Sequence, residues 1–89
     1  MTREEVLAAA LQRVTAKPEE YGQPENAFSL IADLWGYYLS AKNGAIELTP
    51  ADVANMMILL KIARNAQSNK ADTWVDIAGY AACGAEVEV

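Results

Sequence analysis

The sequence predicts an all-α fold, a compact four-helix bundle-like domain, and three observations support this prediction. Apolar residues recur at helical spacing in four segments of the chain. Residues that commonly begin or end helices separate these segments. The length of 89 residues suits one domain, so we expect a single helical domain over residues 1–89. Its helices are expected at about 3–16, 26–42, 50–66 and 72–85.

The first two helices carry recognisable residues at their ends. Thr2 and Glu5 have the spacing of a capping box, in which each side chain accepts a hydrogen bond from the other residue's backbone N–H. Pro18 ends the first helix, and Asn26 is a capping residue for the second. Asn43–Gly44 ends the second helix, because both residues tolerate the left-handed backbone conformation. The apolar stripe of the second helix is expected to contain Phe28, Ile31, Leu34, Trp35, Tyr38 and Leu39.

The last two helices are predicted in the same way. Thr49 is a capping residue, followed by Pro50 in the first turn and by Asp52 at the positive end of the helix dipole. The helix that follows is apolar nearly all round, which is typical of a central, buried helix. Asp72 is the expected capping residue of the last helix. The core face of that helix is expected to contain Trp74, Ile77, Ala78 and Ala81.

Composition limits the class of protein. Hydrophobic residues make up 53% of this short chain, so we expect a homo-oligomer that buries apolar surface between copies. The net charge of −5 disfavours coating of a nucleic acid. The chain has no histidine and one cysteine, Cys83, which excludes an internal disulfide, a zinc site of several Cys or His ligands, and histidine-based catalysis. We therefore expect no metal, no cofactor and no catalytic residue.

The N-terminal residues and the most apolar segment indicate where in the cell the protein is expected. Charged residues at positions 3–5 precede the first apolar residues, which is unlike a signal peptide. The segment VANMMILLKIA is too short to span a bilayer and contains Lys61. We expect a cytoplasmic protein that does not enter a membrane.

Charged residues on the last two helices form the candidate ligand site. Lys61 and Arg64 are three residues apart, so they share one side of an apolar helix and need partners. Asp72 and Asp76 follow after a short turn and are the expected partners. Two interpretations stay open. The four residues clamp the two helices together, or the cations hold a phosphate or carboxylate of a ligand while the aspartates orient them.

Three further residue types add to the candidate site. Tyr80 continues the row of the two aspartates at four-residue spacing, a row that also suits magnesium but is common on exposed helices. Tyr21 and Tyr37 do not fit the apolar stripes, so we expect them outside the core, whereas Trp35, Tyr38 and Trp74 are expected inside it. An aromatic ring beside a cation can hold a nucleobase and its phosphate. Gly79 indicates close approach of another helix, a second subunit or, less favoured, a ligand.

Three blocks of sequence, YGQPENAFSLIADLWGYYL, LTPADVANMMILLKIAR and DTWVDIAGYAA, resemble a small domain of bacteriophages and prophages whose function is unassigned. The resemblance covers about Tyr21 to Ala82 and implies a viral origin and action in the cytosol of an infected bacterium. A more distant similarity is to the all-α, MazG-like nucleotide pyrophosphohydrolases, which bind magnesium through E-x-x-E and E-x-x-D motifs. Here the E-x-x-E motif is absent, and the corresponding helix offers Asp33 alone.

Three hypotheses follow for the function. The first is a non-catalytic phage-type protein that binds a nucleotide and sequesters an immune signal from host defence. The second is an inhibitor that binds a host defence nuclease or CRISPR effector through an acidic surface. The third is a MazG-like, magnesium-dependent pyrophosphohydrolase. The ligand-binding residues of the first hypothesis are Lys61, Arg64, Asp72, Asp76, Tyr80 and Tyr21.

Overall fold

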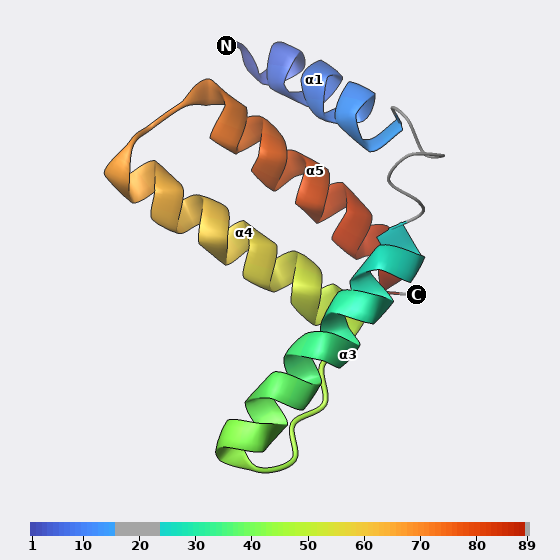
Figure 1. The fold of residues 1–89 in the computed structure, drawn as a ribbon. Helices are drawn as coiled ribbons and strands as arrows, with labels where there is room; N and C mark the ends of the chain where they lie inside the picture. Colours follow the sequence, from blue (N-terminus) through green and yellow to red (C-terminus); the bar gives the residue numbers. More distant parts are fainter. Residues whose placement is uncertain (16–23, 89) are drawn as a thin grey trace.

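The computed structural model describes residues 1–15 and 24–88, which form helices and short connections without a strand. The helices are α1 (Arg3–Thr15), α3 (Pro24–Asn43), α4 (Pro50–Gln67) and α5 (Ala71–Val87) (Figure 1). The predicted all-α class is therefore confirmed, and the helix ends lie within two residues of those expected. None of these helices has the length and apolar character that a membrane span requires.

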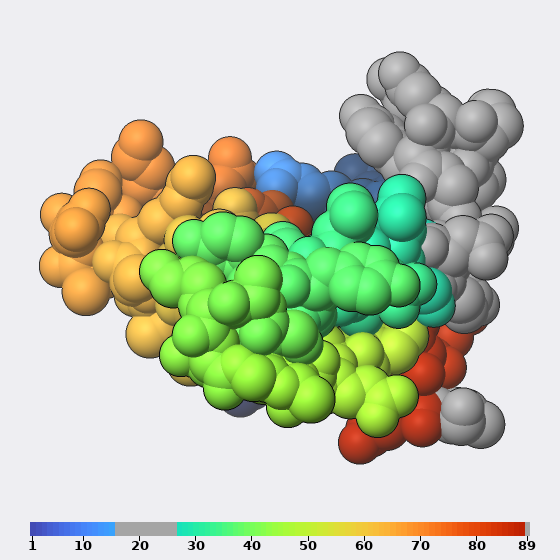
Figure 2. Space-filling model, turned by 60° about the horizontal axis from the view of Figure 1, so that its bottom comes forward, coloured from blue at the N-terminus to red at the C-terminus, as the bar shows by residue number. Residues whose placement is uncertain are grey.

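Three of the helices form a layer, and the fourth crosses it. α1, α5 and α4 lie side by side with α5 in the middle, and α4 and α5 run antiparallel (Figure 1). α3 crosses the layer where the start of α4 meets the end of α5, and its second half extends beyond the layer (Figure 1). Figure 2 shows α3 and the connection after it in front of the layer. The helices thus pack compactly, as predicted, with one face of the layer partly covered by α3.

The core lies at this crossing. Phe28 and Ala32 of α3 are buried against Val53 and Ala54 of α4. From α5, Tyr80 packs on this cluster, with its ring centroid 6.5 Å from that of Phe28. The partly buried residues that complete the cluster are Ala27, Ile31, Trp35, Leu48, Met57, Cys83 and Val87. The core therefore joins the first half of α3 to one end of the α4–α5 hairpin.

The central helix is α5, so the expectation of a central, buried α4 is wrong. α5 packs against α1 on one side and α4 on the other, and its Val75 is almost completely buried. On α4, Val53 is fully buried, but Leu59 is 63% exposed and Ile62 is also exposed. Among the described residues, α4 packs on α5 and α3 along one side only. The apolar residues on its other side remain on the surface.

Two expectations for α5 are also corrected. Trp74 is 52% exposed and Ala81 is exposed as well, so these two residues of the expected core face lie on the surface, whereas Thr73 and Val75 are buried. The N-cap of α5 is Lys70, whose side chain makes no capping hydrogen bond. Asp72 lies inside the first turn, where its charge interacts favourably with the positive end of the helix dipole.

The apolar stripe predicted for α3 is correct only in part. Phe28 is buried, and Ile31 and Trp35 are partly buried against the core. Leu34 and Tyr38, which were expected in the same stripe, are exposed. The reason is that α3 packs on the layer with its first half, whereas helical periodicity extends over its whole length.

The capping residues behave as the sequence predicts. The Thr49 hydroxyl accepts a hydrogen bond from the Asp52 N–H at 3.2 Å, and the Asp52 carboxylate accepts one from the Thr49 N–H at 2.8 Å. The same reciprocal pair joins Thr2 and Glu5, at 3.1 and 2.9 Å. Because Thr49 fixes the first turn of α4, it also fixes the direction in which α4 leaves the core.

The connection between α3 and α4 folds back on α3. Gly44 has a φ of 85°, a left-handed conformation that ends α3 as expected. The Ser40 hydroxyl accepts a hydrogen bond from the Ile46 N–H at 2.9 Å and donates one to the Ile46 carbonyl at 3.1 Å. A methyl group at Gly36 would lie 3.5 Å from that carbonyl oxygen. The connection therefore lies directly on the extended half of α3 and supports it.

Candidate functional site

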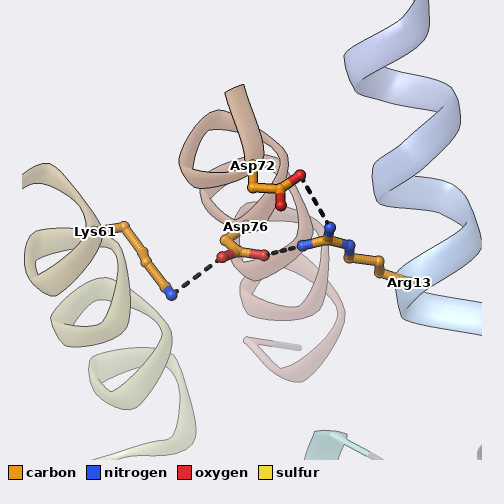
Figure 3. A network of polar contacts seen from close by, with 4 residues as sticks. All are labelled: Arg13, Lys61, Asp72 and Asp76. Carbon is orange, nitrogen blue, oxygen red and sulfur yellow. Dashed lines mark hydrogen bonds and ion pairs between the residues drawn. The ribbon is translucent and has the colours of Figure 1, made fainter. Parts of the chain in front are cut away.

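Four charged residues connect the three helices of the layer (Figure 3). Arg13 on α1 donates hydrogen bonds to Asp76 at 2.5 Å and to Asp72 at 3.2 Å, both on α5. Lys61 on α4 lies 3.1 Å from the second carboxylate oxygen of Asp76. Asp76 thus lies between a cation of α1 and a cation of α4 (Figure 3).

The exposure of the charged side chains determines which of these ion pairs contributes to the stability of the fold. The side chains of Lys61 and Asp76 are only 15% and 26% exposed, so each needs its partner to compensate for lost hydration. The side chain of Asp72 is 77% exposed, and an exposed pair contributes little. Two cations and two anions leave the cluster formally neutral. The arrangement therefore fits a clamp between helices better than a site for a phosphate.

The structure brings together some of the predicted site residues and not others. Lys61 pairs with Asp76, in agreement with the expectation. Arg64 does not join them, since its side chain is exposed and makes no ion pair or hydrogen bond with the side chains of residues 1–15 and 24–88. Arg13 of α1, rather than Arg64, is the second cation that pairs with the two aspartates. Tyr21 lies outside the described residues.

Arg13 is the residue that sequence reasoning missed. It lies on α1, 63 residues before Asp76, so no local spacing relates the two. One observation could have indicated it. In the sequence, Arg13 follows the apolar Ala10 by three residues, and residues three apart share one side of a helix. A cation beside the packed side of α1 needs an acid from the helix opposite, and α5 carries two.

Metal binding by the two aspartates is not supported by this geometry. Each carboxylate oxygen of Asp76 is already engaged by a cation, one by Arg13 and the other by Lys61. Within the described part of the chain, no three His, Cys, Asp or Glu side chains gather where a metal ion could be held. Cys83 is partly buried beside the core cluster, which agrees with the role of a small hydrophobic residue.

A hollow of about 270 Å³ opens between α4 and α5. Its lining is mostly small and apolar, with the polar groups of Asn55, Tyr80 and Glu88. Tyr80 therefore lines this hollow rather than extending the row of aspartates into a charged face. None of the residues that line the hollow is cationic, and Lys61 lies about one helical turn further along α4 than Ile58, which does line it.

Glycines shape the region around the hollow. A methyl group at Gly84 would lie 2.9 Å from the Cβ of Ala54, so α4 and α5 approach closely there. Gly79, which the sequence indicated for a close contact, faces Val14 of α1 at an ordinary 3.6 Å. Another helix of the same chain therefore occupies the position for which a subunit or a ligand was also considered.

A second surface of interest lies on α3. Leu30, Leu34, Tyr37 and Tyr38 recur at helical spacing and are exposed, with Tyr37 at 76%. We call these four residues the α3 outer stripe. The stripe lies on the side of α3 opposite to Phe28 and Ala32, which enter the core. Tyr38 has the ammonium of Lys42 at 5.7 Å from its ring centroid, so Tyr37 is the more open of the two tyrosines.

The fold and the site define a small all-α domain with a neutral ion-pair clamp, a mostly apolar hollow between α4 and α5, and an exposed apolar stripe on α3. The chain belongs to the DUF6378 family, a domain family of unknown function, which matches residues 5–88. It is 52% identical over 66 residues to the Gene 55 protein of Mycobacterium phage L5 and 42% identical over 66 residues to that of Mycobacterium phage D29. Each alignment covers 73% of this chain and 40% of the relative, so the chain spans about two fifths of their length.

These relatives confirm the resemblance to a phage family of unassigned function. No solved structure matches the chain significantly.

Proposed function

We propose that this chain is a non-catalytic, protein-binding domain that contacts a bacterial partner protein through the α3 outer stripe. The observation that carries the proposal is the exposure of four large apolar side chains along one line of α3. Aromatic residues are enriched in protein interfaces, and tyrosine is a frequent source of binding energy there. The second half of α3 also projects beyond the layer, so this part of the helix is open to a partner (Figure 1).

Charge indicates the class of partner. The chain carries a net charge of −5, and the exposed Asp33 lies beside the stripe. A partner with an apolar groove and a basic rim complements this surface. Proteins that bind nucleic acids have such basic surfaces, so a defence nuclease or a CRISPR effector of the host fits the proposal, with inhibition as the outcome.

Site-specific photo-crosslinking in infected cells tests this proposal. A photoreactive amino acid at Tyr37 is expected to capture one protein, whereas the same group at Gln12, on the exposed side of α1, is expected to capture none of it. Binding of the captured protein should fall at least tenfold in a Leu34→Ser/Tyr37→Ser variant, because two anchor residues are lost. It should also weaken as salt screens the charge complementarity. Equal capture at positions 37 and 12 would overturn the proposal.

Nucleotide binding is the second candidate, and the hollow between α4 and α5 favours it. Asn55 supplies an amide that can pair with a base edge, and Tyr80 supplies an aromatic ring at the same wall. Lys61 is paired with Asp76 and Arg64 does not line the hollow, so this proposal places the base of the nucleotide, rather than its phosphate, in the hollow. Such a protein would sequester a nucleotide immune signal without altering it.

Calorimetric titration with mononucleotides and cyclic oligonucleotides tests the second candidate. Micromolar binding that is abolished by Asn55→Leu supports it. Binding that is unchanged by this substitution, or no heat with any nucleotide at micromolar protein, contradicts it.

A further inference from the structure

The outer side of the α4–α5 hairpin carries an uncovered apolar face. Trp74, Ala78, Ala81 and Ala85 follow one another at helical spacing on the side of α5 that points away from Asp76. From α4, Ile58 and Ile62 lie next to them, because the contacts of Ala54 with Gly84 and of Lys61 with Asp76 fix the register of the hairpin. We call these six residues the hairpin outer face. Four of the six residues are exposed: Ile62, Trp74, Ala81 and Ala85.

The hairpin outer face is complementary to itself. Trp74 is a large protruding side chain at one end of the face, and the hollow lined by Ala81 and Ala85 lies at the other end. These two features are about 10–16 Å apart along α5. In a dimer with twofold symmetry, each contact between two positions occurs twice. If the twofold axis passes between Ala78 and Ala81, each Trp74 lies over the hollow of the other copy.

The charges at the ends of the face fit the same arrangement. Lys70 precedes α5 and Glu88 follows it, and both are exposed. Lys70 and Glu88 are eighteen positions apart, which is five helical turns, so they share one side of α5. An antiparallel pair of α5 helices brings Lys70 of each copy near Glu88 of the other, and it also opposes the two helix dipoles favourably.

We propose that the hairpin outer face is the interface of a homodimer, in which the α5 helices of two copies pack antiparallel with Trp74 of each copy in the hollow of the other. The interface is distinct from the α3 outer stripe, so a dimer presents two stripes to its partner. Because Trp74 fills the hollow, dimerisation and nucleotide binding in that hollow exclude each other.

Sedimentation equilibrium of the full chain from 1 to 200 μM tests the proposal. The wild-type chain is expected to be dimeric in the upper part of this range. Ala81→Glu is expected to weaken self-association about a hundredfold, because it buries an unpaired charge in the dimer. The matched control is Ala8→Glu, which adds the same charge at an exposed position of α1. Circular dichroism shows whether each variant retains the fold.

Two further measurements test the orientation. Lys70→Glu and Glu88→Lys, each alone, should weaken the dimer a few-fold, and the double charge reversal should restore it. In a Trp35→Phe background Trp74 is the sole tryptophan, and its fluorescence should shift to shorter wavelength as the dimer forms. A monomer at all concentrations, or a dimer that Ala81→Glu leaves intact, would each overturn the proposal.

Discussion

A methyl group at Gly84 would lie 2.9 Å from the Cβ of Ala54, closer than Cβ atoms approach in folded proteins. This contact sets the distance between α4 and α5 at the end of the hairpin that carries the core. Gly79 lies on the same helix, yet a methyl group there would meet Val14 at an ordinary 3.6 Å. The two glycines therefore differ in what an added methyl group must displace.

Gly84→Ala is expected to destabilise the fold by about 1–2 kcal/mol, since overpacking costs more than the gain in helix propensity returns. Gly79→Ala is the matched control and should be neutral or stabilising by up to about 1 kcal/mol. Urea denaturation followed by circular dichroism measures both. Equal effects of the two substitutions would show that the close approach to Ala54 does not restrict the size of the residue at position 84.

Asp76→Asn is expected to cost more stability than Asp72→Asn. The first substitution removes the partner of the mostly buried Lys61 and weakens the contact with Arg13, at about 1–3 kcal/mol. The second affects an exposed pair with Arg13, at about 0–1 kcal/mol. Denaturation of both variants at low and high salt measures the difference. If the aspartates instead act on a ligand, both variants keep wild-type stability and lose binding.

The parts of the fold that the sequence predicts best are those with local causes. The capping boxes at Thr2 and Thr49 involve residues three positions apart, so their spacing alone indicates the helix starts. Gly44 ends α3 for a similar local reason. The expected partners of Lys61 followed from a short turn between antiparallel helices, and Asp76 is indeed its partner.

The parts that the sequence predicts poorly depend on which helix covers which face. An apolar face on a helix indicates that its burial is favourable, but not which part of the protein covers it. For this reason the sequence predicts Leu34 and Trp74 in the core, whereas the structure leaves both exposed. An α4 that is apolar nearly all round was interpreted as central for the same reason. Arg13 was missed because its partners lie 59 and 63 residues away along the chain.

Gly44→Ala is expected to destabilise the fold by about 1–2 kcal/mol, because residues with a Cβ rarely adopt a φ of 85°. Gly44→Asn should cost less, since asparagine tolerates this conformation. The space around Gly44 is open, so steric contact with neighbours does not contribute. Thermal denaturation of both variants measures the effect. Equal losses for alanine and asparagine would contradict a backbone origin.

Thr49→Ala is expected to lower the stability by about 1 kcal/mol, because it removes the hydroxyl that accepts the Asp52 N–H. Thr49→Ser keeps that hydroxyl and serves as the control. Hydrogen exchange at residues 50–53 should accelerate in the alanine variant only. Unchanged exchange in this first turn would indicate that core packing of Val53, rather than the cap, holds the start of α4.

The capping box of α1 makes the start of that helix sensitive to acid. The hydrogen bonds from the backbone N–H and side chain of Thr2 lower the pKa of Glu5 below its ordinary value of 4.5. A depressed pKa in the folded state means that Glu5 stabilises α1 above pH 4.5, and that this stabilisation is lost as the pH falls through the folded-state pKa. Carbon NMR of the Glu5 carboxyl should give a titration midpoint below 4.5, which Thr2→Ala should raise toward 4.5. Glu5→Gln retains a hydrogen-bond acceptor that does not titrate, so it should remove the acid-dependent fraying of α1. If α1 still frays at low pH in this variant, another titrating group is responsible for the fraying.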